Sequence, residues 1–115
     1  MEHKLSGIEL VLTDVDGTIV VDRQHEPSPR VVETIARLQS AGVHIAIASA
    51  RPPGLAEAIV RNLGLRGPQI IDGGASIYDF DTQETIWKSW LDLERLRKVS
   101  AIVMEYSHII DCFPE

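Results

Sequence analysis

The sequence has a single cysteine, no long apolar run and no cluster of basic residues, and each of these absences excludes a class of protein. Because Cys112 is the only cysteine among 115 residues, an internal disulfide is impossible and a cysteine-rich metal site is excluded. No segment approaches the ~18 continuous apolar residues of a membrane-spanning helix, and the charged start of the chain lacks the apolar stretch of a signal peptide. We therefore expect a cytoplasmic protein, with Cys112 as a small apolar side chain.

The charge distribution narrows the choice of partners. The net charge is −6, and the 11 lysines and arginines are scattered along the chain. This pattern argues against a nucleic-acid or membrane partner, and an anionic substrate would need local help such as a metal ion. Apolar residues make up 44% of the chain, without low-complexity segments, so we expect one compact folded domain.

Apolar runs alternate with helical patterns over the first two thirds of the chain. Residues 8–13, 43–48 and 69–72 read as strands, and the nearly continuous hydrophobicity of the first is typical of a strand covered on both faces. Helical patterns occupy residues 28–42 and 55–63 between them. This βαβαβ order predicts an α/β fold: half of a doubly wound, Rossmann-like sheet, with three parallel strands and flanking helices.

The ends of both helices are marked by residues with known capping preferences. Ser28 suits the N-cap, Pro29 suits the first helical position, and Gly42 and Gly64 suit the C-terminal stops. The apolar residues expected on the buried faces are Val31, Ile35 and Leu38 in the first helix and Leu55, Ile59, Val60 and Leu63 in the second.

The pattern changes after residue 74. Residues 75–80 and 84–90 are strand-like and are separated by three polar residues, which predicts an antiparallel hairpin. A helix is expected from Asp92, with Glu94 and Lys98 paired four residues apart. We interpret its apolar stripe as an ordinary packing surface, made of Leu96, Val99, Val103, Tyr106 and Ile110.

The segment LTDVDGT places two aspartates at the end of the first strand. Ligands of open parallel sheets bind beyond the carboxyl ends of the strands. Asp14 and Asp16 are two residues apart and point to the same side of an extended segment, whereas Val15 turns toward the core. Two close carboxylates repel each other unless a cation is present, and Mg²⁺ prefers such oxygen ligands. A metal-fixed carboxylate can also attack phosphorus, and Gly17 would let backbone N–H groups approach a phosphate.

The segment following the second strand supplies groups suited to an anion. Ser49 offers a hydroxyl and Arg51 a guanidinium at the same edge of the sheet, just before a helix. Each feature also has a simpler interpretation: the DVDG segment as a strand-ending turn, Ser49 as an N-cap, and Arg51 as a member of a surface ion pair.

Taken together, LTDVDGTIV, IAIASARPP and IIDGGASIYD resemble three consecutive motifs of the haloacid dehalogenase (HAD) superfamily. The resemblance is to its Cof-like branch, which contains sugar-phosphate phosphatases with an inserted α/β cap. It implies that residues 1–84 form the N-terminal half of the core. Residues 85–115 would then be a hairpin strand and a helix at the start of a truncated cap.

The resemblance also implies a role for each motif residue. Asp14 would be the nucleophile and a Mg²⁺ ligand, forming a phosphoaspartate. Asp16 would be the general acid and base, with its main-chain carbonyl on the metal. Ser49 would hydrogen-bond the transferring phosphoryl group of a small phosphorylated substrate, with Gly17 and Arg51 as further phosphate-binding residues.

The chain departs from the family pattern at two positions. Ala50 stands where this branch often has glycine, and Gly73 stands where it commonly has asparagine, although the neighbouring Asp72 could compensate. Family members also carry, after the cap, a lysine and a Gly-Asp stretch that complete the site. No Gly-Asp dipeptide occurs here, and Lys88 and Lys98 fall within the apparent cap.

We therefore expect an N-terminal part of a phosphatase that is nearly inactive alone, with an exposed sheet edge that favours a homo-oligomer. The alternative is a non-catalytic binding or regulatory module that retains the half-core. A phosphoacceptor receiver domain fits poorly, because its phosphorylated aspartate is expected at the third strand.

Overall fold

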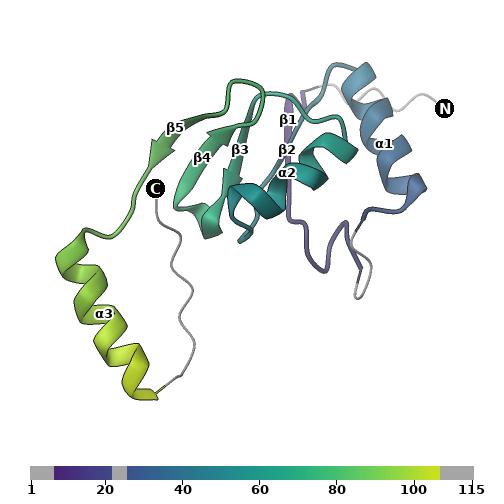
Figure 1. Cartoon of the computed structure of the whole chain (residues 1–115). Coiled ribbons are helices and arrows are strands. Elements are labelled where there is room, and N and C mark those ends of the chain that lie inside the picture. The colour runs from purple at the N-terminus through teal and green to yellow at the C-terminus, as the bar shows by residue number, and fades with distance from the viewer. Residues whose placement is uncertain (1–6, 22–25, 107–115) are drawn as a thin grey trace.

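A computed structural model of the chain describes residues 7–21 and 26–106, and Figure 1 shows the path of the chain. Strands and helices alternate over the first half, and a hairpin followed by a separate helix forms the second half. The elements are β1 (Leu10–Thr13), α1 (Pro29–Ser40), β2 (His44–Ile47), α2 (Pro53–Asn62), β3 (Pro68–Ile71), the 3-10 turn η1 (Asp72–Gly74), β4 (Ser76–Asp79), β5 (Glu84–Lys88) and α3 (Leu93–Tyr106).

The three N-terminal strands run parallel, but only two of them share a regular ladder. β1 and β2 pair in parallel over their full lengths, from Leu10 opposite His44 to Thr13 opposite Ile47. β3 lies on the other side of β2 and joins it through one parallel bridge between Ala48 and Ile70. The predicted α/β half-sheet is therefore confirmed, and the third of its three parallel strands joins the β1–β2 ladder only through this bridge.

The side chain of Gln69 explains the interrupted ladder. It is fully buried, and its Oε1 accepts the backbone N–H of Ile47 in β2 at 2.8 Å. Its Nε2 donates to the carbonyl of Gly67 at 3.1 Å and more weakly to that of Arg66 at 3.4 Å. A side-chain amide thus holds β2 to β3 where a parallel sheet would use a main-chain bond.

The hairpin predicted after residue 74 is confirmed. β4 pairs antiparallel with both β3 and β5. β3 therefore lies between the bridge to β2 on one edge and the ladder to β4 on the other. The carboxylate of Asp79 accepts the N–H groups of Asp81 at 2.8 Å and Thr82 at 3.3 Å, which closes the turn between β4 and β5. The boundary expected between residues 84 and 85 stays a prediction.

α1 begins and ends as the sequence predicts, whereas α2 begins at Pro53, two residues before the predicted pattern, and ends where predicted. Ser28 is the N-cap of α1, where its Oγ accepts the N–H of Val31 at 3.4 Å, and Gly42 and Gly64 follow the ends of α1 and α2. Leu55 departs from the prediction, because 62% of it is exposed and Ala56 takes its place on the buried face. The core joins the strands to both helices, and its most buried apolar residues are Val15, Ile45, Ile47, Ala56, Ile59 and Ile71.

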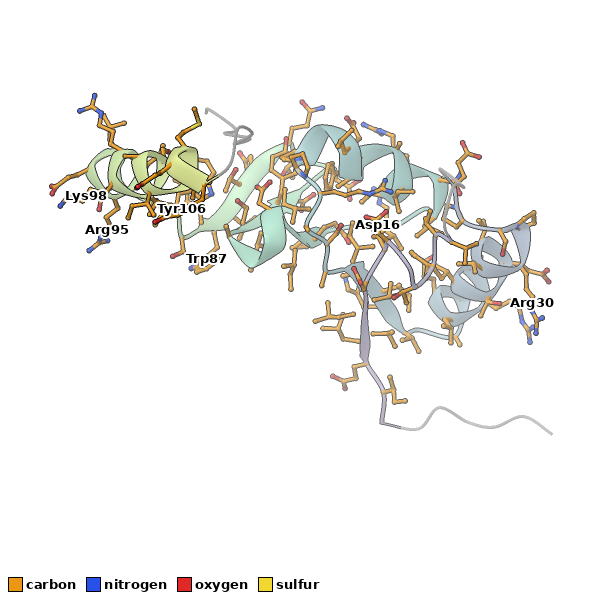
Figure 2. The ribbon with its side chains drawn as sticks, turned by 90° about the horizontal axis from the view of Figure 1, so that it is seen from below. Asp16, Arg30, Trp87, Arg95, Lys98 and Tyr106 are labelled. Atoms are coloured by element: carbon orange, nitrogen blue, oxygen red, sulfur yellow. The ribbon has the colours of Figure 1, made fainter. Side chains whose placement is uncertain are left out.

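α3 extends away from the rest of the chain (Figure 1). The Cα radius of gyration is 17.0 Å, against about 13 Å for a compact domain of this size. The apolar stripe is not packed: Val99 is 45% exposed and Tyr106 is 82% exposed, so its interpretation as a packing surface is wrong for the described part of the chain. Lys98 and Glu94 do pair, at 2.6 Å. Figure 2 shows Arg95, Lys98 and Tyr106 around this helix.

Two expectations near the C-terminus, for Ile110 and Cys112, concern positions outside the described residues. Within residues 7–21 and 26–106, no helix is both long and apolar enough to cross a membrane.

Candidate functional site

The residues singled out in the sequence gather at one edge of the half-sheet. Asp14 follows β1, Ser49 follows β2, and Asp72 follows β3. Figure 2 shows Asp16 on the loop after β1, with α3 at the far end of the molecule. Because parallel strands end at the same edge, the three motif segments are brought together where open α/β sheets bind ligands.

Val15 anchors the turn after β1. It is completely buried, as predicted, while Asp14 and Asp16 on either side of it are exposed. The turn is closed by a bond from the N–H of Gly17 to the carbonyl of Val20 at 2.8 Å. The Val15 carbonyl accepts three backbone N–H groups at 3.0–3.2 Å, from Thr18, Ile19 and Val20. The carboxylates are therefore carried on a tightly bonded loop.

Gly17 is needed for its backbone conformation. Its φ of 79° lies in the left-handed region, and an added Cβ would meet no atom within 4 Å, so the constraint is conformational. Its N–H is already bonded to the Val20 carbonyl. The predicted part of Gly17 in phosphate binding stays a prediction, and in this arrangement its own N–H is not available to an anion.

Asp14 presents one carboxylate oxygen to solvent. Its Oδ1 accepts the N–H of Val15 at 2.8 Å, and its main-chain carbonyl accepts the hydroxyl of Thr13 at 3.0 Å. Within the described parts of the chain, Oδ2 has no hydrogen-bond partner. A fixed carboxylate with one open oxygen has the geometry required of a nucleophile or a metal ligand.

Asp16 and Arg51 form a two-pronged ion pair. Nη2 of Arg51 donates to Oδ1 of Asp16 at 2.6 Å, and Nε donates to Oδ2 at 2.9 Å. The hydrogen bond from Arg51 is the main reason that the pKa of Asp16 lies below its usual value, with burial opposing it, and the pKa of Arg51 is raised by the same contact. The simpler interpretation of Arg51 as an ion-pair residue is therefore correct, and its partner is the candidate catalytic carboxylate.

Ser49 ties the second motif to the third. The residue is 5% exposed, and its Oγ accepts the N–H of Arg51 at 3.1 Å. Its carbonyl accepts the N–H of Gly73 at 3.1 Å, and the carbonyl of Arg51 accepts the N–H of Asp72 at 3.0 Å. Pro52, not Ser49, is the N-cap of α2, so the capping alternative is wrong. A pocket of about 280 Å³ lies here, lined by Ala48, Ser49, Ala50, Ile70, Gly73 and Gly74.

The conformation of Gly73 accounts for its replacement of the family asparagine. Its φ of 64° and ψ of 24° lie in the left-handed region, which glycine adopts freely and asparagine tolerates better than most residues. Both residues can adopt this conformation, so glycine in place of asparagine removes a side chain without straining the turn. Asp72 also has a positive φ, of 53°. Its compensating role stays a prediction.

The turn after β1 carries two oxygen atoms that could hold a magnesium ion. One is Oδ2 of Asp14, which accepts no hydrogen bond from the described residues. The other is the main-chain carbonyl oxygen of Asp16, because the three N–H groups of this turn donate to the Val15 carbonyl instead. Protein Mg²⁺ sites commonly combine one or two such oxygens with waters and substrate phosphate, so the donors fit the ion. Across the residues that the structure describes, no group of three or more histidine, cysteine, aspartate or glutamate side chains is placed to hold a metal.

Sequence reasoning missed two features of this edge. The first is the set of hydrogen bonds made by Gln69, which lies in the apolar segment QII. A polar side chain in a buried strand normally has a hydrogen-bond partner inside the protein, so its position was a usable signal. Asp16 and Arg51 were both identified, but their pairing joins residues 35 apart in sequence and has no local signal.

Comparisons with known proteins bear on the family and the fold. A family model described as haloacid dehalogenase-like hydrolase matches residues 11–113. A Mycoplasma pneumoniae protein provisionally named a phosphatase is 25% identical over 117 residues, covering 95% of this chain and 40% of that protein. The chain therefore spans well under half the length of this curated relative.

Solved structures share the fold. A HAD-superfamily phosphatase from Bacteroides thetaiotaomicron has a TM-score of 0.73 and 23% identity, over 86% of this chain and 36% of its own. A haloacid dehalogenase-like hydrolase from B. subtilis has a TM-score of 0.75 and 19% identity, over 86% and 34%. A subclass IIB sugar phosphatase of the HAD superfamily has a TM-score of 0.69 and 23% identity, over 85% and 38%.

Proposed function

The chain belongs to the haloacid dehalogenase-like hydrolases, and from that premise we propose that it carries the nucleophile half of a Mg²⁺-dependent phosphate-monoester hydrolase site. The observation that supports this most directly is the meeting of two motif loops at the ends of β1 and β2. There the open oxygen of Asp14 lies on the same turn as Asp16, which Arg51 contacts from the second loop.

The proposed chemistry follows the family roles. An oxygen of Asp14 bonds to phosphorus while the bond from phosphorus to the substrate oxygen breaks, and Asp16 delivers a proton to that leaving oxygen. A water then bonds to phosphorus and gives its proton to Asp16, and the bond from phosphorus to Asp14 breaks. The Ser49 hydroxyl and the Arg51 guanidinium would hold the phosphoryl oxygens. When bound, Mg²⁺ would neutralise the clustered negative charge.

We propose a small phosphorylated metabolite as the substrate class. The support is the sugar phosphatase named among the structurally similar proteins and the absence of a basic cluster in the sequence. A cytoplasmic location, and the lack of nucleic-acid or membrane partners, stay predictions from composition.

Metal binding and turnover test the proposal together. Calorimetry of the 115-residue chain should detect weak Mg²⁺ binding that Asp14→Asn removes, whereas Glu33→Gln, an exposed charge change on α1, should leave it intact. Hydrolysis of p-nitrophenyl phosphate should be nearly absent, because the lysine and Gly-Asp stretch of the family do not occur in this sequence. Unchanged Mg²⁺ binding in Asp14→Asn would refute the role of Asp14 as a metal ligand. Strong Mg²⁺-dependent hydrolysis would refute the proposal that this chain carries only half of the active site.

A non-catalytic binding module is the second candidate. It is favoured by the ion pair of Asp16, because Arg51 contacts both oxygens of the carboxylate that the enzyme would need for proton transfer. Both candidates bind Mg²⁺ and a phosphate mimic in a calorimetric titration. Extending the chain by whatever the reading frame encodes after Glu115 separates them: phosphate release abolished by Asp14→Asn supports the enzyme, and binding without release supports the module.

We also propose self-association through β1. Within the described residues β1 pairs only with β2, and its other edge is open. Leu10 and Leu12 lie on one face of this strand and are 51% and 50% exposed, so the expectation of a strand covered on both faces is wrong in the described chain. Open edges with apolar side chains favour pairing with another chain. Light scattering should show a mass that rises with concentration, and a strict monomer at high concentration would contradict the proposal.

A further inference from the structure

Asp16 engages two adjacent donors of the Arg51 guanidinium in this structure. Its Nη2 and Nε contact both oxygens of the carboxylate, and its remaining contact, from Nη1 to the carbonyl of Leu55, is long at 3.4 Å. The Arg51 side chain is only 21% exposed, whereas that of Asp16 is 60% exposed. The parallel Nε and Nη2 donors, which form one of the two-pronged arrangements that suit a phosphate, are therefore occupied by an internal carboxylate.

The backbone of Arg51 is fixed from both sides. Its N–H donates to the Oγ of Ser49, and its carbonyl accepts the N–H of Asp72. A change of partner must therefore come from the side chain. The fork of guanidinium donors matches carboxylate and phosphate oxygens equally well, so either anion can take the same two N–H groups.

We propose that Asp16 and a bound phosphoryl group compete for the Arg51 fork, so that phosphate binding releases both oxygens of Asp16. This rests on the proposed function, since it assumes that a phosphoryl group binds beside Ser49. The release would link phosphate binding to catalysis: the Asp16 carboxylate, which must meet the leaving oxygen and the attacking water, is freed from Arg51 when the anion arrives. Arg51 is thus a positioning residue for Asp16 as well as a ligand of the anion.

Titration of the ¹⁵N-labelled 115-residue chain with inorganic phosphate, without added metal, tests the competition. The Nε–H signal of Arg51, assigned by its loss in Arg51→Lys, should move as phosphate saturates. Asp16→Asn should bind phosphate about 2–5-fold more tightly than the unmodified chain, because the competing ion pair is gone. Asp72→Asn is the matched control: it removes an equal charge from the same edge, keeps the pair, and should gain less.

The possible failures are distinguishable. Saturable phosphate binding without movement of the Arg51 signal, or equal gains in Asp16→Asn and Asp72→Asn, would overturn the competition and leave the proposed function standing. Absence of phosphate binding by the unmodified chain and both aspartate variants would overturn the competition and the phosphate-binding part of the proposed function together.

Discussion

Replacing Gln69 with leucine should destabilise the chain by about 2 kcal/mol. Gln69 is fully buried, and its Oε1 is the acceptor for the N–H of Ile47, itself completely buried. A leucine of similar size leaves this N–H without a partner, at a cost of about 1–3 kcal/mol. The carbonyls of Arg66 and Gly67 border an exposed loop, where water can replace the lost donor. The unpaired N–H of Ile47 therefore accounts for most of the expected fall in the free energy of unfolding.

Urea unfolding followed by circular dichroism measures this change. The free energy of unfolding should fall by about 2 kcal/mol, with a decrease in Tm of roughly 10 °C. Gln39→Leu is the matched control, because Gln39 makes one exposed bond, to the Gly64 carbonyl at 3.1 Å, and its loss should cost below about 0.5 kcal/mol. Equal effects of the two substitutions would refute the assignment of Gln69 as the link between β2 and β3.

Three further predictions concern individual contacts. Because Arg51 lowers the pKa of Asp16, the stability from their pair is present above the ordinary aspartate value of about 3.9 and is lost as pH falls through the lowered folded value. The difference in urea midpoint between Arg51→Ala and the unmodified chain should therefore shrink from pH 6 to pH 2.5, and a constant difference would contradict this. Urea unfolding should show that Gly73→Asn lowers the free energy of unfolding by under about 0.5 kcal/mol and Gly73→Val by about 1–2 kcal/mol. The reason is the left-handed conformation of this residue, which branched side chains do not adopt readily. Equal losses in the two variants would count against this reason. Trp90→Phe should cost about 1 kcal/mol through loss of the 2.9 Å bond from its indole N–H to the buried Oγ of Ser76, and an unchanged urea midpoint would show that this bond contributes nothing.

The alternation of strands and helices could be predicted because its signals are local. Ser28 and Gly42 mark the ends of α1 by their own chemistry, and the apolar runs mark the strands by composition. The DVDG turn was recognisable for the same reason. The three motifs also identified the family correctly, as the match to the family model confirms.

The remaining features depend on distant partners. The ion pair of Asp16 with Arg51 and the bond from Ile47 to Gln69 join residues 35 and 22 apart. Neither has a periodic signal, and the substitution of a side-chain bond for a ladder bond cannot be seen from strand propensity. The stripe on α3 showed that the helix is amphipathic, but amphipathicity does not say whether a partner surface is present.

The bonds that join the candidate site have a consequence for the order of folding. The pair of Asp16 and Arg51 cannot form until the chain has closed a loop of 35 residues that includes all of α1. The bonds from Asp72 and Gly73 to the loop after β2 require, in addition, that α2 has crossed over the sheet. Loop-closure entropy makes such contacts slow to form. Because the pairing of Leu10 with His44 closes a loop of nearly the same length, we expect the contact of Asp16 with Arg51 to form together with the β1–β2 ladder and the bonds from Asp72 and Gly73 to form after it.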